Sequence, residues 1–269
     1  MINIQQASLQ MKNCPKAKMN KLLGVFILVF LQSCSLLLAP NYKTVSAQIP
    51  PDTIALYDSS RSREIPIALY KSKSKFHSLV VISHGYNQNE GTPYLGYSFI
   101  ANDLTKKGYY VVSIQHELLS DSLLPNHGVP QLVRRPFWER GADNIYFVIQ
   151  EMKKRFSQLD DQHIILIGHS IGGDMAALFP QKYPGVVSKI ITLDNRRMAL
   201  SRTNNPKIYS LRSCDQVADT GVLPSEEEQH TFDITVIKLP ETQHNNMCDN
   251  ANNKQQKEML KYCNAFLND

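Results

Sequence analysis

The stretch HIILIGHSIGGDMAAL, residues 163–178, decides the fold of this 269-residue chain. Strand-forming aliphatic residues come first, glycine, serine and glycine follow at alternate positions, and a helix-forming run closes the stretch. A strand that ends at Ile167 and a helix that starts near Ile171 leave Ser170 in the turn itself. Glycine two positions before and after avoids collision with the neighbouring backbone. The pattern therefore predicts an exposed serine nucleophile at the end of a strand.

Strands and helices are expected to alternate on both sides of this turn. Two strand-like runs joined by SSRSR, within residues 53–71, predict an antiparallel hairpin. Further strands are expected at 78–83, 109–115, 163–167, 187–194, 207–212 and 232–239, and helices at 95–107, 137–156, from 171, and at 253–267. This order predicts an α/β fold with a mostly parallel eight-stranded sheet and helices on both faces. One domain over residues 49–269 is sufficient.

The first 48 residues have the features of an export leader. Lysines precede the short apolar run LLGVFILVF, as in a signal peptide. LQSC, ending at Cys34, resembles a bacterial lipoprotein site, whereas VSA, ending at Ala47, fits ordinary signal peptidase. We favour lipidation of Cys34, which predicts an exported protein tethered at a membrane surface; cleavage after Ala47 would give a secreted one.

The positive charge of the chain belongs to this leader. Residues 1–47 contain five lysines and no acidic residue, so 24 of the 29 basic residues remain to balance 24 acidic ones. Without a basic field, no nucleic-acid partner is expected.

A serine nucleophile needs a base, and the position of His244 fits best. In parallel α/β sheets the catalytic groups gather at the carboxyl ends of the strands, and His244 directly follows the last expected strand. His84 and His169 lie within the predicted site loops, where we read them as histidines that bond to backbone or line the pocket.

Two backbone N–H groups are expected to stabilise an oxyanion. One belongs to Ile171, the residue after the nucleophile. The other is assigned to Tyr86, because Gly85 in the sequence HGYN permits a tight turn after the buried strand 78–83.

Taken together, SHGY, GHSIGG, a later acid and a His in the final loop resemble the α/β-hydrolase superfamily from about Thr53 to the end. The hairpin, the HG loop and LDNRRM look most like the branch of dienelactone hydrolases, platelet-activating-factor acetylhydrolases and polyester hydrolases. The resemblance implies an α/β-hydrolase fold and hydrolysis of a small or lipid-like carboxylic ester through an acyl-serine. It implies no metal and no organic cofactor. Peptidases share this machinery, and a binding protein on an inactive hydrolase fold is a further alternative.

Two aspartates compete for the role of triad acid. Asp194 ends the strand 187–194, and LDNRRM looks like the acid segment of platelet-activating-factor acetylhydrolases. Asp215 follows the next strand, the usual position in α/β-hydrolases, and DQVA resembles the acid loop of polyester hydrolases. The predicted triad is therefore Ser170, Asp215 and His244.

The cysteines give this choice a second support. If Asp215 reaches His244, the neighbouring Cys214 and Cys248 come close, and an oxidising compartment would let them form a disulfide. The alternatives are a bridge between Cys248 and Cys263, or three reduced thiols.

The connection after Asp194 has only about a dozen residues, which is too short for a large cap domain. The long polar loop 117–136 is then expected either to form a wall or lid near Trp138, or to be an ordinary surface loop.

Overall fold

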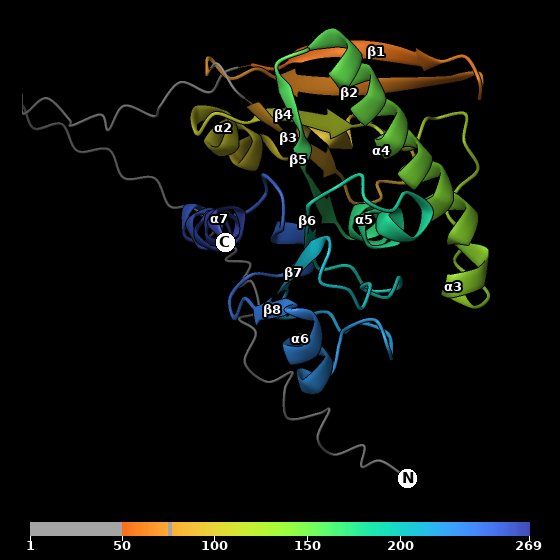
Figure 1. Ribbon diagram of the computed structural model, residues 1–269. Coiled ribbons are helices and arrows are strands. Elements are labelled where there is room, and N and C mark those ends of the chain that lie inside the picture. The colour runs from red at the N-terminus through yellow and green to blue at the C-terminus, as the bar shows by residue number, and fades with distance from the viewer. Residues whose placement is uncertain (1–49, 75–76) are drawn as a thin grey trace, which may run out of the picture.

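The structure is a computed structural model that describes residues 50–74 and 77–269 (Figure 1). The predicted leader and its two processing sites, at Cys34 and Ala47, lie outside the described residues. Within the described ranges, no helix is both long and apolar enough to cross a membrane.

Eight strands form one sheet in the order β1-β2-β4-β3-β5-β6-β7-β8. Their bounds are β1 Asp52–Asp58, β2 Arg63–Tyr70, β3 His77–Ser83, β4 Tyr110–Ile114, β5 Leu159–His169, β6 Lys189–Leu193, β7 Lys207–Arg212 and β8 Thr235–Lys238. The β1–β2 hairpin pairs antiparallel and joins β4 antiparallel, whereas all pairs from β4 to β8 are parallel. The predicted eight-stranded, mostly parallel sheet is confirmed.

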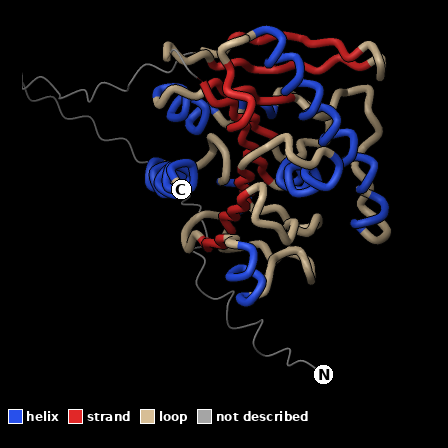
Figure 2. The backbone as a smooth tube through the Cα atoms, viewed as in Figure 1, coloured by secondary structure: helices blue, strands red, loops and turns tan. Residues whose placement is uncertain are grey.

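Helices cover both faces of the sheet (Figure 2). They are η2 Pro93–Leu95, α2 Ser98–Lys106, α3 Pro130–Val133, α4 Arg135–Arg155, α5 Ile171–Lys182, α6 Glu226–Phe232, η3 His244–Asn246 and α7 Asn253–Asn268. The helices α4 and α5 pack on one face, and α2 and α7 pack on the other (Figure 1).

Strand β3 shows why both faces must be covered. Its side chains point alternately to the two sides, so Leu79 and Val81 join the core under α4 and α5, while Val80 and Ile82 join the core under α2 and α7. All four are almost completely buried, and each contributes roughly 1.5–3 kcal/mol to folding. Trp138, expected near the site, is instead fully buried in the first core.

Parallel pairing brings the carboxyl ends of six strands, β4-β3-β5-β6-β7-β8, to one edge. Ser83 of β3 pairs with Gly168 of β5, and His169 pairs with Leu193 at the end of β6. Leu193 in turn pairs with Leu211 near the end of β7. The loops that follow these strands are therefore neighbours, as the sequence argument required.

The region before β8 differs from the expectation of a strand starting at 232. Residues 226–232 form α6, because Ser225 and Glu228 make a capping box and three glutamates lie in the first turn, where the helix dipole favours acids. Asp233 ends the helix in a left-handed conformation. Strand β8 consequently has only four residues.

Candidate active site

Ser170 lies in the turn between β5 and α5 with φ +53° and ψ −118°. This is a strained backbone conformation for a residue with a side chain. A Cβ on Gly168 would lie 2.3 Å from the carbonyl oxygen of Gly172, and one on Gly172 would lie 2.3 Å from that of Ser83. Both glycines are therefore required, as predicted, and the serine side chain is half-buried rather than enclosed.

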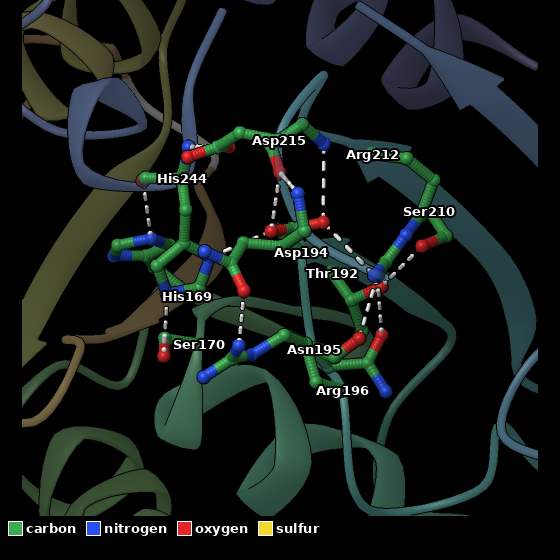
Figure 3. Close-up of polar contacts among 12 residues, drawn as sticks. His169, Ser170, Thr192, Asp194, Asn195, Arg196, Ser210, Arg212, Asp215 and His244 are labelled. Atoms are coloured by element: carbon green, nitrogen blue, oxygen red, sulfur yellow. Dashed lines mark hydrogen bonds and ion pairs between the residues drawn. The ribbon is translucent and has the colours of Figure 1, made fainter. Parts of the chain in front are cut away.

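A continuous chain of polar contacts joins serine, histidine and aspartate (Figure 3). The Nε2 atom of His244 lies 2.9 Å from Oγ of Ser170. On the other side of the ring, Nδ1 lies 2.6 Å from Oδ2 of Asp194. An N–H at Nδ1 donates to the carboxylate, so Nε2 is left to accept the serine proton.

Asp194 is fully buried, and both of its carboxylate oxygens have hydrogen-bond or ion-pair partners. Oδ1 accepts the backbone N–H of Ser213 at 3.0 Å and pairs with the Arg212 guanidinium at 2.9 Å. Oδ2 accepts the hydroxyl of Ser213 at 2.7 Å besides the His244 ring. Burial alone would raise the pKa of Asp194, but the His244 and Ser213 hydrogen bonds and the Arg212 charge hold it below its ordinary value.

The prediction that Asp215 binds the His244 ring is wrong. Asp215 is exposed and accepts the backbone N–H of His244 at 2.7 Å instead (Figure 3). The physical reason lies in the turn after β6, where Asp194 adopts φ +58°, a left-handed conformation that brings its carboxylate against the ring. Asp215 thus anchors the base loop, while Asp194 has the contact expected of a triad acid.

Asp174, on α5, holds the loop that carries Asp194. Its Oδ1 accepts the backbone N–H groups of Arg196, Arg197 and Met198 at 3.2, 3.0 and 2.9 Å. Burial raises the pKa of Asp174 to about 6 despite these bonds. Asp174 was not among the predicted site residues, although an acid four residues after the nucleophile, in the first turn of its helix, is a pattern visible in the sequence.

The two expected oxyanion donors lie directly after Ser170 and in the loop after β3. The N–H of Ile171 begins α5, and in the described part of the chain neither it nor the N–H of Tyr86 donates a hydrogen bond. An ideal Cβ on Gly85 would lie 3.4 Å from Cβ of Ser170, so the loop carrying Tyr86 passes close to the nucleophile. Two unused donors beside a serine form an arrangement that can accept a developing oxyanion.

His84 and His169 bond to backbone, as expected. Nδ1 of His84 lies 2.8 Å from the carbonyl oxygen of Gly85, and its Nε2 accepts the N–H of His116. Nε2 of His169 lies 3.0 Å from the carbonyl oxygen of His244. Burial lowers the pKa of His84 to about 4 and that of His169 to about 3, so both rings are neutral at ordinary pH.

The predicted disulfide between Cys214 and Cys248 is not formed. Cys248 and Cys263 are free thiols, which also excludes a bridge between these two. Cys214 is disulfide-bonded, so the alternative of three reduced thiols is wrong as well. The two loops do meet, since the N–H of Cys214 donates to Thr242 and Asp215 accepts the N–H of His244, but the thiol of Cys248 is directed to the carbonyl oxygen of Asn245 at 3.4 Å.

The loop 117–136 contacts both sides of the site. The N–H of Leu124 donates to the hydroxyl of Tyr86 at 2.9 Å. Nε2 of Gln131, on α3, donates to Asp219 in the loop after β7 at 3.0 Å. Asp121 ties the start of the loop to Arg63 through two hydrogen bonds of 2.7 and 2.8 Å. The loop is thus packed against the oxyanion side and the acid side.

A cavity of about 450 Å³ adjoins the oxyanion loop and the base loop. Its lining includes Tyr86, Asn87, Tyr97, His169, Asn245 and Cys248. Residues 195–206, between β6 and β7, contain no helix, so no cap covers the site from there. Among the described side chains, no group of three or more His, Cys, Asp or Glu is arranged to hold a metal ion.

Comparisons with known proteins agree with this architecture. Residues 74–193 match the family described as serine aminopeptidase, S33. No curated protein is significantly similar in sequence. A solved thermostable esterase has 16% identity and a TM-score of 0.53, covering 70% of this chain; this chain spans only 54% of that protein.

For two further solved structures, the match covers nearly the whole length of the other protein. Esterase 2 of Thermogutta terrifontis, phosphorylated by paraoxon, has 11% identity, a TM-score of 0.59 and coverage of 82% of this chain and 94% of that one. An alpha-beta serine hydrolase homologue from Coxiella burnetii has 12% identity, a TM-score of 0.52 and coverage of 81% and 99%. With the sheet order and the strand-turn-helix at Ser170, these likenesses show that the chain has the α/β-hydrolase fold.

Proposed function

We propose that this protein is a serine hydrolase that cleaves carboxylic esters through an acyl-serine intermediate. The observation that carries the proposal is the unbroken contact chain from Ser170 through His244 to the buried Asp194, at 2.9 and 2.6 Å. The esterases among the structural neighbours support the choice of an ester bond.

In the proposed reaction, Oγ of Ser170 attacks the ester carbonyl and its proton passes to Nε2 of His244. The N–H groups of Tyr86 and Ile171 stabilise the oxyanion, each contributing roughly 3–4 kcal/mol to lowering the barrier. The alcohol leaves with the proton from His244. Water, deprotonated by His244, then attacks the acyl-enzyme and releases the carboxylic acid.

The substrate class is proposed from the surroundings of the nucleophile. The adjoining cavity has asparagine side chains in its wall and a volume of about 450 Å³, which fits a short, partly polar ester better than a long acyl chain. The loop 117–136 would influence the substrate through Tyr86, which lines the cavity and whose hydroxyl accepts the N–H of Leu124. A panel of p-nitrophenyl esters graded by acyl length, run with and without a shortened loop, tests both points. An unchanged chain-length preference would remove the loop from the substrate site.

Replacing the nucleophile tests the reaction itself. Ser170→Ala should abolish hydrolysis of p-nitrophenyl acetate while the melting temperature changes little. Ser188→Ala is a matched control. Ser188 lies just before β6, at the amino end of the strands and away from Ser170, and its hydroxyl donates to the backbone carbonyl oxygen of Ile164. Full turnover by Ser170→Ala would contradict the proposal and favour a binding protein on an inactive hydrolase fold.

Peptide hydrolysis is the second candidate, because the matching family is described as a serine aminopeptidase. The same triad can attack an amide. Turnover of aminoacyl p-nitroanilides at rates comparable with those of p-nitrophenyl esters would favour the peptidase.

We further propose that the chain is exported and lipidated at Cys34, on the basis of LQSC after an apolar run. Metabolic labelling with a lipid analogue tests this. A label that survives Cys34→Ala, or no label at all, would leave cleavage after Ala47.

A further inference from the structure

Tyr97 lies directly before α2 and connects two parts of the site that are far apart in sequence. Its side chain is only 4% exposed, and its hydroxyl lies between the oxyanion loop and the nucleophile turn. The N–H of Gly85 donates to this hydroxyl at 2.9 Å. The same oxygen lies 2.8 Å from Nδ1 of His169. The proposed chemistry at Ser170 does not by itself require this hydroxyl.

The direction of each proton follows from the groups involved. The carbonyl oxygen of His244 can only accept, so Nδ1 of the neutral His169 ring is left without a proton; the Tyr97 hydroxyl accepts from Gly85 and directs its own hydrogen to that nitrogen. The neutral His169 ring then carries its proton on Nε2 and donates it to the carbonyl oxygen of His244 at 3.0 Å. The result is one relay from Gly85 through Tyr97 and His169 to the base loop.

The relay fixes one of the two peptide units that flank Gly85. His84 fixes the other, because its Nδ1 donates to the carbonyl oxygen of Gly85 at 2.8 Å. In a trans peptide the N–H points opposite to the C=O, so the hold on this carbonyl also sets the direction of the Tyr86 N–H. A Cβ on Gly85 would lie 2.9 Å from Nδ1 of His169, which shows how tightly the loop is placed against that ring.

A second connection ties the Tyr97 segment to the base loop. The carboxylate of Asp249 accepts the N–H groups of Ser98 and Phe99 at 3.0 and 3.1 Å, in the first turn of α2. The N–H of Asp249 donates to the carbonyl oxygen of Gly96 at 2.8 Å. Tyr97 is therefore held from both sides by the loop that carries His244.

We propose that Tyr97 is a positioning residue that holds the Tyr86 N–H, as oxyanion donor, and the base His244 in their correct positions on either side of Ser170. This inference rests on the proposed function, since it assigns Tyr97 a role in the same acyl transfer. Tyr97 touches no reacting atom; it acts through Gly85 on one side and through His169 on the other.

Tyr97→Phe is the direct test, because it removes only the hydroxyl and leaves the ring in the core. The Gly85 N–H and Nδ1 of His169 then lose their partner. Because a complete oxyanion donor is worth about 100–1,000-fold in kcat, a misaligned one should cost about 10–100-fold, with KM for p-nitrophenyl acetate changed less than about threefold. Tyr209→Phe is the matched control: Tyr209 is equally buried, and its hydroxyl bonds to Asp269 away from the site.

Both variants should lose similar thermal stability, but only Tyr97→Phe should lose kcat. Equal kcat in the two variants would overturn the role of Tyr97 while leaving the proposed function intact. No ester turnover by the wild type would overturn the proposed function, and this inference with it.

Nitrogen NMR of histidine in the wild-type protein supplies a test that does not depend on a variant's folding. His169 should show the Nε2–H tautomer with no protonation between pH 5 and 9, assigned by its absence from His169→Gln. A proton on Nδ1, or titration in that range, would contradict the relay.

Discussion

The loop after β6 and the loop after β7 both bring an aspartate to His244, at different atoms. Asp194 is fully buried, contacts the imidazole ring and is bound by Ser213 and Arg212. Asp215 is exposed and contacts only the backbone N–H of the same histidine. A carboxylate affects proton transfer through the ring it contacts, so proximity to the histidine alone does not identify the acid. The contrast makes the two loops the natural place to test the account.

The largest difference is expected between the asparagine variants of the two aspartates. Asp194→Asn should lower kcat for p-nitrophenyl acetate by about 10⁴-fold, because the amide favours the wrong tautomer of His244. Steady-state kinetics with Asp215→Asn as the matched variant measure the difference. If Asp194→Asn retained activity within tenfold of the wild type, the assignment of the acid would fail.

Removing the cation beside Asp194 is the next test. Arg212 is buried, pairs with Asp194 and donates from Nη1 to the carbonyl oxygen of Asn195 at 2.6 Å. Arg212→Met leaves a buried carboxylate without this partner, so the free energy of unfolding should fall by about 3–5 kcal/mol. Urea unfolding checks it, with the more exposed Arg155→Met as control. A loss below about 1 kcal/mol would show that the buried pair contributes little.

The buried Asp174, which holds the loop of Asp194, should make the free energy of unfolding depend on pH. Its pKa is about 6 in the folded protein and lies near 3.8 in an unfolded chain. Between these values the folded state keeps a proton that the unfolded state releases, so this group makes the protein less stable as pH rises from 4 to 6. The contribution amounts to about 1.4 kcal/mol for each unit of pKa difference.

Urea unfolding of wild type and Asp174→Asn at pH 4 and pH 7 measures this contribution. The wild type should lose stability relative to the variant on going to pH 7. A constant difference between the two proteins would mean that Asp174 has the same pKa in both states.

The smallest effect is expected on the other loop. Asp215→Asn keeps an oxygen that can accept the N–H of His244, so kcat/KM should change less than about fivefold. Asp215→Ala removes the acceptor and should cost more, through a less well-placed base loop. A loss of orders of magnitude in the asparagine variant would restore Asp215 as the acid.

The parts of the molecule that depend on local pattern were predictable from sequence. Ser170 between two glycines, the buried run 78–83 and His244 after the last strand each follow from residues close together in the chain. Strand pairing then brought these segments to one edge, as the alternation of strands and helices required.

The triad acid was not predictable in the same way, because it depends on one backbone conformation. Asp194, like Ser170, directly follows a strand and has a positive φ, and nothing in the residue types distinguishes it from Asp215. Two further features could not be read from the spacing of apolar residues, because each depends on hydrogen-bond partners. They are the capping box of Ser225 at the start of α6 and the relay through Tyr97.

The most direct measurement is to identify the residue that a covalent ester analogue modifies. Thermogutta terrifontis esterase 2 was solved phosphorylated by paraoxon, which recommends this reagent. Here Oγ of Ser170 should attack phosphorus, p-nitrophenolate should leave, and peptide mass spectrometry should find one diethylphosphoryl group on Ser170 with matching loss of esterase activity. Ester hydrolysis that continues without modification of Ser170, or a label on another residue that accounts for the inactivation, would contradict the account.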